Sequence, residues 1–208
     1  MNKAAFLDRD GVINRKPPEG QYVTRWGEML FLPDVANAIA KLNKADFRVI
    51  VVSNQRCVAK GLVTAADVDA IHQRMCSELA AAGAVIDAVY YCPHEKQPPC
   101  SCRKPAPGML LSAAHEHQID LAVSWMIGDS DIDVAAGRNA GCKTARLMGS
   151  DKTANCTADV VARSLLDAIH KILKSERVIA DQRTKGNTTA QLKDRGRRPA
   201  GPPGRLST

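Results

Sequence analysis

Short apolar runs alternate with longer amphipathic stretches along most of the chain, and each apolar run ends in a polar cluster. This alternation predicts parallel βαβ units, because strands that are buried on both faces appear as continuous apolar runs. The candidate strands are residues 3–7, 48–52, 88–91, 124–127 and 143–147. The candidate helices are residues 34–45, 64–82, 107–118, 131–139 and 164–174. The predicted fold class is therefore α/β, with a doubly wound parallel sheet.

The helix expected over residues 64–82 has recognisable ends. Thr64 followed three positions later by Asp67 resembles a capping box, in which each side chain binds the backbone N–H of the other residue. Gly83 then provides a stop, since glycine readily ends a helix. The histidines in helical patterns are expected to be surface or packing residues: His72, His115, His117 and His170.

Four loops that follow predicted strands carry unusual polar residues. Ligands of such a sheet bind at the carboxyl ends of the strands, so the chemistry is expected in these loops. They contain Asp8-Arg9-Asp10-Gly11, Ser53-Asn54-Gln55-Arg56, a Cys/His loop followed by Lys104, and Gly128-Asp129-Ser130-Asp131-Ile132-Asp133.

Asp8 and Asp10 are separated by one residue directly after an apolar strand, and Gly11 allows the chain to turn at once. Alternate side chains of extended backbone share a face, so both carboxylates can point to one site. With Asp129 and Asp133 they predict a Mg2+ site, because Mg2+ takes oxygen ligands and leaves room for phosphate. The alternative is that two aspartates simply begin a turn.

An acidic metal site beside Lys104 and Ser53 predicts phosphoryl transfer. That reaction needs cations to offset the phosphate charge, a hydroxyl and N–H groups to hold its oxygens, and a nucleophile in line. A carboxylate can be the nucleophile and form an aspartyl-phosphate. We therefore expect Asp8 to attack, with Mg2+ screening its repulsion from the phosphate.

Residues 92–102 read CPHEKQPPCSC and bring Cys92, His94, Cys100 and Cys102 close together in sequence. Thiols and an imidazole are the ligands of a tetrahedral Zn2+ site, and Cys-x-His and Cys-x-Cys can each bind from one turn. Unlinked thiols with a surface histidine are one alternative. A disulfide is another, although neighbours such as Cys100 and Cys102 are poorly placed to bridge. The prediction is a structural zinc loop that aims the two basic residues following it.

Most of the formal net charge of +7 lies at the C-terminal end of the chain. Residues 176–208 hold eight Lys/Arg and three Asp/Glu, which leaves 21 basic and 19 acidic residues for 1–175. This tail is rich in Gly, Pro and Thr, so we predict one domain over 1–175 and a disordered basic extension. Nucleic-acid binding through the tail is disfavoured, because the tail lacks aromatic residues that stack on bases.

Cysteine number and hydropathy bear on the compartment. Seven cysteines is an odd number, and no apolar run approaches the roughly 20 residues that span a bilayer. The N-terminal sequence MNKAAFLDRDG reaches charged residues too early for a signal peptide. We therefore expect a cytoplasmic protein with reduced thiols, without membrane association, and a monomer.

Four segments in order, FLDRDGV, VVSNQ, RKP and GDSDID, resemble the motifs of the haloacid dehalogenase (HAD) superfamily of aspartate-nucleophile phosphatases. The resemblance covers about residues 3–150. The Cys-x-His loop, CSCRKP and PGML are similar to the heptose 1,7-bisphosphate phosphatases and the related histidinol-phosphatase domains, which are small members. The resemblance implies a Rossmann-like fold of HAD type without a large cap domain.

The resemblance also implies a role for individual residues. Asp8 matches the nucleophile, and Asp10 matches the general acid and base. Mg2+ would be held by Asp8, the backbone carbonyl of Asp10 and Asp129. Ser53 and Lys104 match the pair that stabilises the phosphoryl group.

A further group of residues matches positions that bind substrate or support the site. Asp133 matches a position that supports the metal or the lysine. Residue 57 is Cys where many members have Gly, Ser130 stands where some have a basic residue, and RKPPEGQY is longer than in some members. The implied substrate contacts are Glu19, Gly20, Gln21, Tyr22, Ser53, Asn54, Gln55, Arg56, Arg103, Lys104 and Ser130.

The activity that the resemblance implies is removal of the C7 phosphate of D-glycero-D-manno-heptose 1,7-bisphosphate, toward nucleotide-activated heptose for surface polysaccharide such as lipopolysaccharide. Histidinol-phosphatase or another small-molecule phosphatase is the alternative, and VAKG after SNQ and PGML after RKP favour the heptose enzymes. An alternative of another class is a zinc-stapled nucleic-acid-binding module. That module leaves the four strand-end motifs unexplained.

Overall fold

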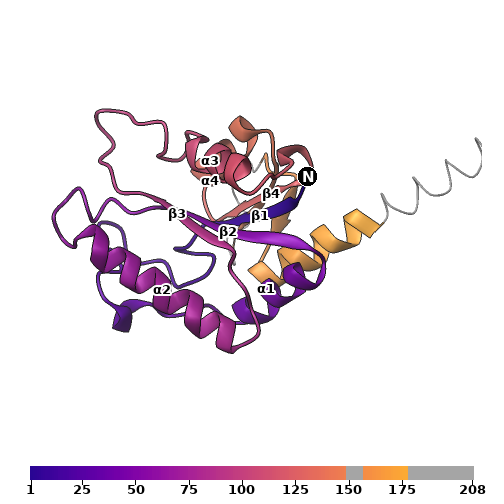
Figure 1. The fold of residues 1–208 in the computed structure, drawn as a ribbon, viewed down its shortest axis with the longest axis horizontal. Helices are drawn as coiled ribbons and strands as arrows, with labels where there is room; N and C mark the ends of the chain where they lie inside the picture. The colour runs from indigo at the N-terminus through magenta and orange to yellow at the C-terminus, as the bar shows by residue number, and fades with distance from the viewer. Residues whose placement is uncertain (149–156, 178–208) are drawn as a thin grey trace, which may run out of the picture. The chain divides into compact units, whose positions relative to one another are not determined.

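Six parallel strands form a single sheet in the computed structural model, which describes residues 1–148 and 157–177 (Figure 1). The order is β3-β2-β1-β4-β5-β6, and every neighbouring pair is parallel. The strands are β1 (Lys3–Leu7), β2 (Phe47–Asn54), β3 (Ala88–Cys92), β4 (Trp125–Gly128), β5 (Lys143–Leu147) and β6 (Val160–Ala162). The doubly wound parallel sheet predicted from the sequence is confirmed, and β6 is an addition to it.

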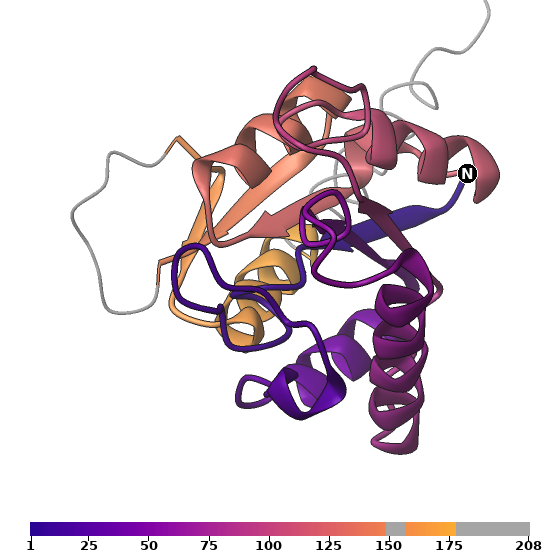
Figure 2. The same ribbon diagram turned by 90° about the vertical axis from the view of Figure 1, so that its left-hand side faces the viewer.

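Helices cover both faces of this sheet. The elements are α1 (Val35–Lys44), α2 (Ala65–Ala81), α3 (Gly108–Glu116), α4 (Asp131–Ala140) and the 3-10 turns η1 (Trp26–Glu28) and η2 (Leu121–Val123). Residues 165–177 are also helical. Figures 1 and 2 show α1 and α2 on one face and α3 and α4 on the other. Crossover connections of this kind are needed because neighbouring strands of the sheet are parallel.

The apolar runs of the sequence become the centre of the sheet. Phe6 of β1, Ile50 of β2 and Met126 of β4 are fully buried and pack in one cluster with Leu110 of α3. Burying each such side chain contributes about 1.5–3 kcal/mol. This core fixes the strands whose carboxyl ends carry the polar loops.

The predicted ends of α2 are confirmed in detail. The Thr64 side chain accepts a hydrogen bond from the backbone N–H of Asp67, and the Asp67 carboxylate accepts one from the Thr64 N–H. Gly83 follows the helix with φ of 79°, a conformation that glycine adopts readily. The sequence therefore identified both ends of this helix.

The order of the strands decides where ligands bind. The connections run in one direction from β1 through β2 to β3, and β4 then returns to the other side of β1. Such a reversal between β1 and β4 opens a crevice at the carboxyl ends of these two strands. Asp8 follows β1 directly, and Asp129 follows β4 directly.

Residues 1–171 form one compact unit. The predicted domain boundary at residue 175 stays a prediction, and most of the basic tail, from residue 178 onward, lies outside the described residues. Among the helices of the described ranges, none is both long and apolar enough to cross a bilayer.

Candidate active site and metal loop

The side chains of Asp8 and Lys104 are in contact at the carboxyl ends of the central strands. Lys104 Nζ donates to Asp8 Oδ1 at 2.8 Å and to the backbone carbonyl of Val52 at 2.8 Å. The Lys104 side chain is only 2% exposed, and that of Asp8 is 13% exposed. One oxygen of Asp8 is thus fixed by a buried cation, which sets the direction of the other.

Burial shifts the protonation of this pair. Burial raises the pKa of Asp8 to about 7, with Asp133 and Asp10 adding to the rise and Lys104 opposing it. Burial also tends to lower the pKa of Lys104, but the carboxylates of Asp8 and Asp133 outweigh it, and the net shift is upward. Lys104 therefore remains a cation, and a further positive charge would hold Asp8 ionised.

Asp133 contacts both Lys104 and the residue that caps the start of α4. Its Oδ1 lies 2.7 Å from Lys104 Nζ. Its Oδ2 accepts hydrogen bonds from the backbone N–H and the hydroxyl of Ser130, which completes a capping box. Asp133 thus positions Lys104. The resemblance implies support of either the metal or the lysine, and this contact fits support of the lysine.

Asp10 is held by three side chains. Arg9 donates to both Asp10 oxygens at 3.0 Å, Asn14 donates to Oδ1 at 2.9 Å, and Gln55 donates to Oδ2 at 3.2 Å. Arg9 itself is fully buried and also contacts His72 Nε2 at 3.1 Å. This network orients the carboxylate predicted to act as acid and base, and the sequence pattern alone did not reveal it.

A cavity of about 240 Å³ joins these residues to residues 16–22, called the substrate loop because it carries four of the predicted substrate contacts. The predicted positions Glu19, Gly20, Gln21 and Tyr22 all line it. Four further residues of the lining were not predicted from the sequence: Lys16, Pro17, Pro18 and Ile132. The remaining lining residues are Asp8, Asp10, Ser53, Asn54, Lys104, Asp129, Ser130 and Asp133.

Three predicted substrate contacts lie outside the lining of this cavity. Gln55 is buried and donates to Ser53 Oγ at 2.8 Å as well as to Asp10. Arg56 pairs with Glu95, and Arg103 donates to the backbone carbonyl of His94 at 3.2 Å. Their contact with substrate stays a prediction, and the structure gives Gln55 a place beside Asp10.

The thiol of Cys57 helps to explain the orientation of Gln55. Its Sγ lies 3.7 Å from Gln55 Oε1, and the residue is fully buried. The side chain that replaces the usual glycine is therefore turned into the protein and contacts the Gln55 amide. It does not narrow the cavity.

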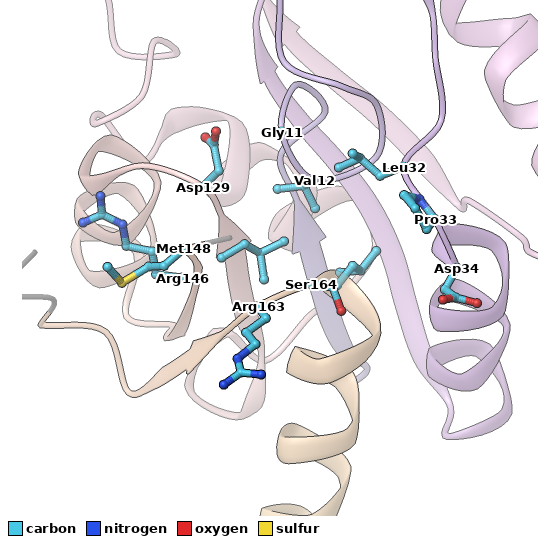
Figure 3. Close-up of a pocket in the computed structure, with 12 residues that line it drawn as sticks. Gly11, Val12, Leu32, Pro33, Asp34, Asp129, Arg146, Met148, Arg163 and Ser164 are labelled. Carbon is cyan, nitrogen blue, oxygen red and sulfur yellow. The ribbon is translucent and has the colours of Figure 1, made fainter. Parts of the chain in front are cut away.

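A second cavity is larger, at about 650 Å³, and Figure 3 shows residues that line it. Asp129 lines both cavities, and Gly11, Val12, Arg146 and Arg163 line the larger one. Arg146 is paired with the exposed Asp131. Asp8 and Lys104 line only the smaller cavity, so the predicted phosphoryl chemistry is assigned to that cavity despite the difference in volume.

The Cys/His loop brings four potential ligand atoms within 4.8 Å of one another. Cys92 Sγ lies 3.6 Å from both His94 Nδ1 and Cys100 Sγ, while Cys102 Sγ lies 3.2 Å from His94 Nδ1 and 3.4 Å from Cys100 Sγ. A tetrahedral zinc with Zn–S near 2.3 Å and Zn–N near 2.0 Å separates its ligands by roughly 3.5–3.8 Å. All three thiols are free, so a disulfide in this loop is not formed.

Three hydrogen bonds hold the metal loop (residues 92–102) and the segment after it, which carries Lys104, against the rest of the domain. The side-chain amide of Asn54 donates to the Lys104 carbonyl at 3.1 Å and accepts from the Lys104 N–H at 3.1 Å. Gly108 N donates to Ser101 O at 3.0 Å, and a Cβ at Gly108 would lie 2.3 Å from that oxygen. The start of α3 therefore requires glycine against the loop, which explains the PGML motif.

Carboxylates near Asp8 fit a divalent cation. Ligand oxygens of Asp8, Asp129 and Asp133 all lie within 4.8 Å of one another. Lys16 Nζ already lies 2.7 Å from Asp129 Oδ2, so a cation is drawn to this cluster. Burial raises the pKa of Asp129, and Lys16 opposes the shift. Lys104 and Ser130 together engage both oxygens of Asp133, whereas Lys104 engages only one oxygen of Asp8. Asp8 and Asp129 are therefore the carboxylates available to Mg2+.

Comparisons with known proteins agree with this site. The HAD-hydrolase-like family model matches residues 101–168. The D-glycero-beta-D-manno-heptose-1,7-bisphosphate 7-phosphatases of Bordetella bronchiseptica and Escherichia coli K12 are 41% and 38% identical to the chain, over 67% and 84% of it and 77% and 95% of their own lengths. The crystal structure of D,D-heptose 1.7-bisphosphate phosphatase from B. bronchiseptica, complexed with magnesium and phosphate, has a TM-score of 0.74 at 34% identity and covers 83% of this chain and 99% of that one.

The doubly wound sheet and the Asp8–Lys104–Asp129 cluster define a HAD-type hydrolase with an aspartate at the end of its first strand. At these identities over most of both sequences, the chain belongs to the D-glycero-D-manno-heptose-1,7-bisphosphate 7-phosphatase family.

Proposed function

We propose that this protein is a Mg2+-dependent phosphomonoesterase that removes the C7 phosphate of D-glycero-D-manno-heptose 1,7-bisphosphate. The observation that carries the proposal is Lys104, which lines the cavity of about 240 Å³ and whose ammonium group is shared by Asp8 and Asp133. The family membership supports the choice of substrate. The proposal places this reaction in the cytoplasm, where the free thiols of the metal loop stay reduced.

Asp8 acts as the nucleophile. Its free oxygen attacks the C7 phosphorus, a bond from Asp8 to phosphorus forms, and the bond from phosphorus to the C7 oxygen breaks. Asp10 gives a proton to that leaving oxygen and later takes one from the water that cleaves the aspartyl-phosphate. Bound Mg2+ supplies positive charge that offsets the phosphate. Ser53 and Lys104 line the cavity where the phosphoryl oxygens are held.

We also propose that Cys92, His94, Cys100 and Cys102 hold a structural Zn2+. The separations of the four ligand atoms, between 3.2 and 3.6 Å for the close pairs, support this assignment. The loop ends one residue before Arg103 and two before Lys104. A metal that stiffens the loop therefore helps to position the lysine.

The test is phosphate release with Mg2+ from the heptose 1,7-bisphosphate, in both anomers, and from histidinol phosphate. We expect kcat/KM to be highest for one heptose anomer. Asp8→Asn is expected to lose at least roughly 10³-fold in kcat while its circular dichroism is unchanged. Asp46→Asn, an exposed carboxylate at the amino end of β2, is the control and is expected to keep full turnover.

Three results would each contradict a different part of the proposal. Faster turnover of histidinol phosphate would overturn the substrate, whereas full activity of Asp8→Asn would overturn the mechanism. Absence of turnover on every phosphomonoester would overturn the enzyme itself, and the nucleic-acid-binding alternative would then be tested by titration with RNA.

A further inference from the structure

Lys16 is a cation that reaches into the active site from the substrate loop. Its Nζ lies 2.7 Å from Asp129 Oδ2, although its side chain is 58% exposed. The loop that carries it is the RKPPEGQY segment, which continues through Pro17 and Pro18 along the wall of the cavity. The ammonium group therefore lies between the metal-binding carboxylate and the space that substrate enters.

The backbone on the N-terminal side of Lys16 is held by hydrogen bonds. Arg15 N donates to Leu30 O at 2.7 Å, and Asn14 Nδ2 donates to Arg15 O at 2.9 Å. Pro17 restricts Lys16 to extended conformations. A lysine ammonium moves on a flexible four-carbon stem, so the charge can change partner while the loop stays in place.

The other cations near the reacting carboxylates are already committed. Lys104 is buried between two carboxylates, and Arg9 is fully buried against Asp10 and His72. Breaking such buried contacts costs far more than breaking an exposed ion pair. Of these three cations, Lys16 is the one that can leave its carboxylate partner at a small cost in free energy.

The cavity lining offers few cations to the second phosphate of a bisphosphate. Among the described residues that line the cavity, Lys16 and Lys104 alone are basic, against five acidic residues: Asp8, Asp10, Glu19, Asp129 and Asp133. The position after Asp129 is the neutral Ser130. Arg56 and Arg103 are predicted substrate contacts, but they lie outside this lining and contact Glu95 and the His94 carbonyl. Because Lys104 is committed to the reacting phosphate, Lys16 is the cation of the lining that is left for the second one.

We propose that Lys16 pairs with Asp129 in the metal-free enzyme and moves to the second phosphate of the substrate when Mg2+ binds Asp129. The inference rests on the proposed function for its substrate. Mg2+ and Lys16 draw on the same carboxylate charge, so each weakens the binding of the other. Lys16 is then a residue that determines specificity for a bisphosphate over a single phosphate.

The first test compares two substrates that share the reacting phosphate. Lys16→Gln is expected to lower kcat/KM for the heptose 1,7-bisphosphate by roughly tenfold or more, and for the heptose 7-phosphate by less than about threefold. Lys16→Arg keeps the charge and is expected to retain most of the preference. Lys44→Gln, at the exposed end of α1, is the control and should change neither value. Equal losses on both substrates would overturn the inference.

The second test needs no turnover. Calorimetric titration of the substrate-free protein with Mg2+ should give a Kd that is roughly two- to fivefold lower in Lys16→Gln than in the wild type. An unchanged Kd would overturn the exchange at Asp129. If the wild type hydrolyses neither heptose phosphate, the proposed function fails, while the titration still decides whether Lys16 and Mg2+ compete.

Discussion

Lys104 Nζ lies 2.7 Å from Asp133 Oδ1, and the side chains of both residues are 2% exposed. Asp133→Asn keeps the shape of the side chain and removes its charge. We expect kcat/KM to fall by roughly 10- to 100-fold, and the free energy of unfolding to fall by about 1–3 kcal/mol, because the buried lysine loses one of two carboxylates. Phosphate release and urea unfolding measure the two effects.

The control for that substitution lies on the same turn of α4. Asp131 is 82% exposed, so Asp131→Asn is expected to change the free energy of unfolding by less than about 1 kcal/mol and to leave turnover intact. Wild-type turnover by Asp133→Asn would contradict the role of Asp133 in holding Lys104.

Gly11→Ala should weaken Mg2+ binding although it replaces none of the proposed ligand residues. Gly11 has φ of 93°, and a Cβ there would lie 2.3 Å from Asp129 Oδ2. The added methyl must push the Asp129 carboxylate aside, so we expect the Kd for Mg2+ to rise by roughly tenfold or more. Calorimetric titration with Mg2+ measures this change.

Gly83→Ala separates backbone strain from the clash with Asp129. Gly83 also has positive φ, at 79°, but nothing lies within 4 Å of the position that an added Cβ would occupy. Gly83→Ala should lower the free energy of unfolding by an amount similar to that of Gly11→Ala, and it should keep the wild-type Kd for Mg2+. If both alanine variants bound Mg2+ equally, contact between Gly11 and Asp129 would not matter.

Cys100→Ser tests whether the metal loop and the catalytic lysine are coupled. Loss of one thiolate ligand should reduce bound zinc from about one equivalent to a small fraction, and kcat should fall with it. Elemental analysis and phosphate release are measured on the same sample. Cys76→Ser, on α2 and outside the cluster, is expected to leave both unchanged. Full turnover by a zinc-free Cys100→Ser protein would refute the coupling.

His72 makes stability depend on pH. Burial and the neighbouring Arg9 lower the pKa of His72 from 6.5 to about 3, with Asp10 opposing the shift. Below pH 6.5 the unfolded chain therefore binds a proton that the folded protein does not, so stability is complete above that pH and falls toward pH 3. Between pH 7.5 and 5.5 this one group costs about 1.4 kcal/mol of unfolding free energy.

His72→Gln removes that contribution. Urea unfolding at pH 7.5 and 5.5 should show a smaller loss in the variant than in the wild type, whatever the absolute stability of the variant. His115→Gln, at an exposed position of α3, should keep the wild-type loss. An identical pH dependence in all three proteins would rule out His72 as its source.

The sequence predicted β1 and β5 to the residue, and the other three predicted strands to within two residues at each end. Their apolar runs are buried on both faces, and the loops that end them are polar, so pattern and structure agree. β6 was missed because three residues, Val160–Ala162, are too few to show a pattern. The four ligand atoms of the metal loop were predicted from spacing alone, since they are close in sequence.

Contacts between distant residues were harder to foresee. Arg9 was expected in a polar loop, yet it is fully buried because His72, 63 positions later, and Asp10 satisfy it. Gln55 was expected to contact substrate, which stays a prediction, and its hydrogen bond to Asp10 was not foreseen. Lys16 could have been noticed, because its segment departs from the pattern of the family, but its partner Asp129 lies 113 positions away.

The paired hydrogen bonds between the Asn54 amide and the Lys104 backbone hold the chain as a neighbouring strand would. Cys92 belongs to β3, so both ends of the intervening segment are fixed independently of its length. Insertions or deletions between His94 and Cys100 therefore leave the lysine where it is, provided that the four ligands still meet. The length of this segment is therefore expected to vary more freely than that of the residues on either side of it, as long as the Arg56–Glu95 pair is kept.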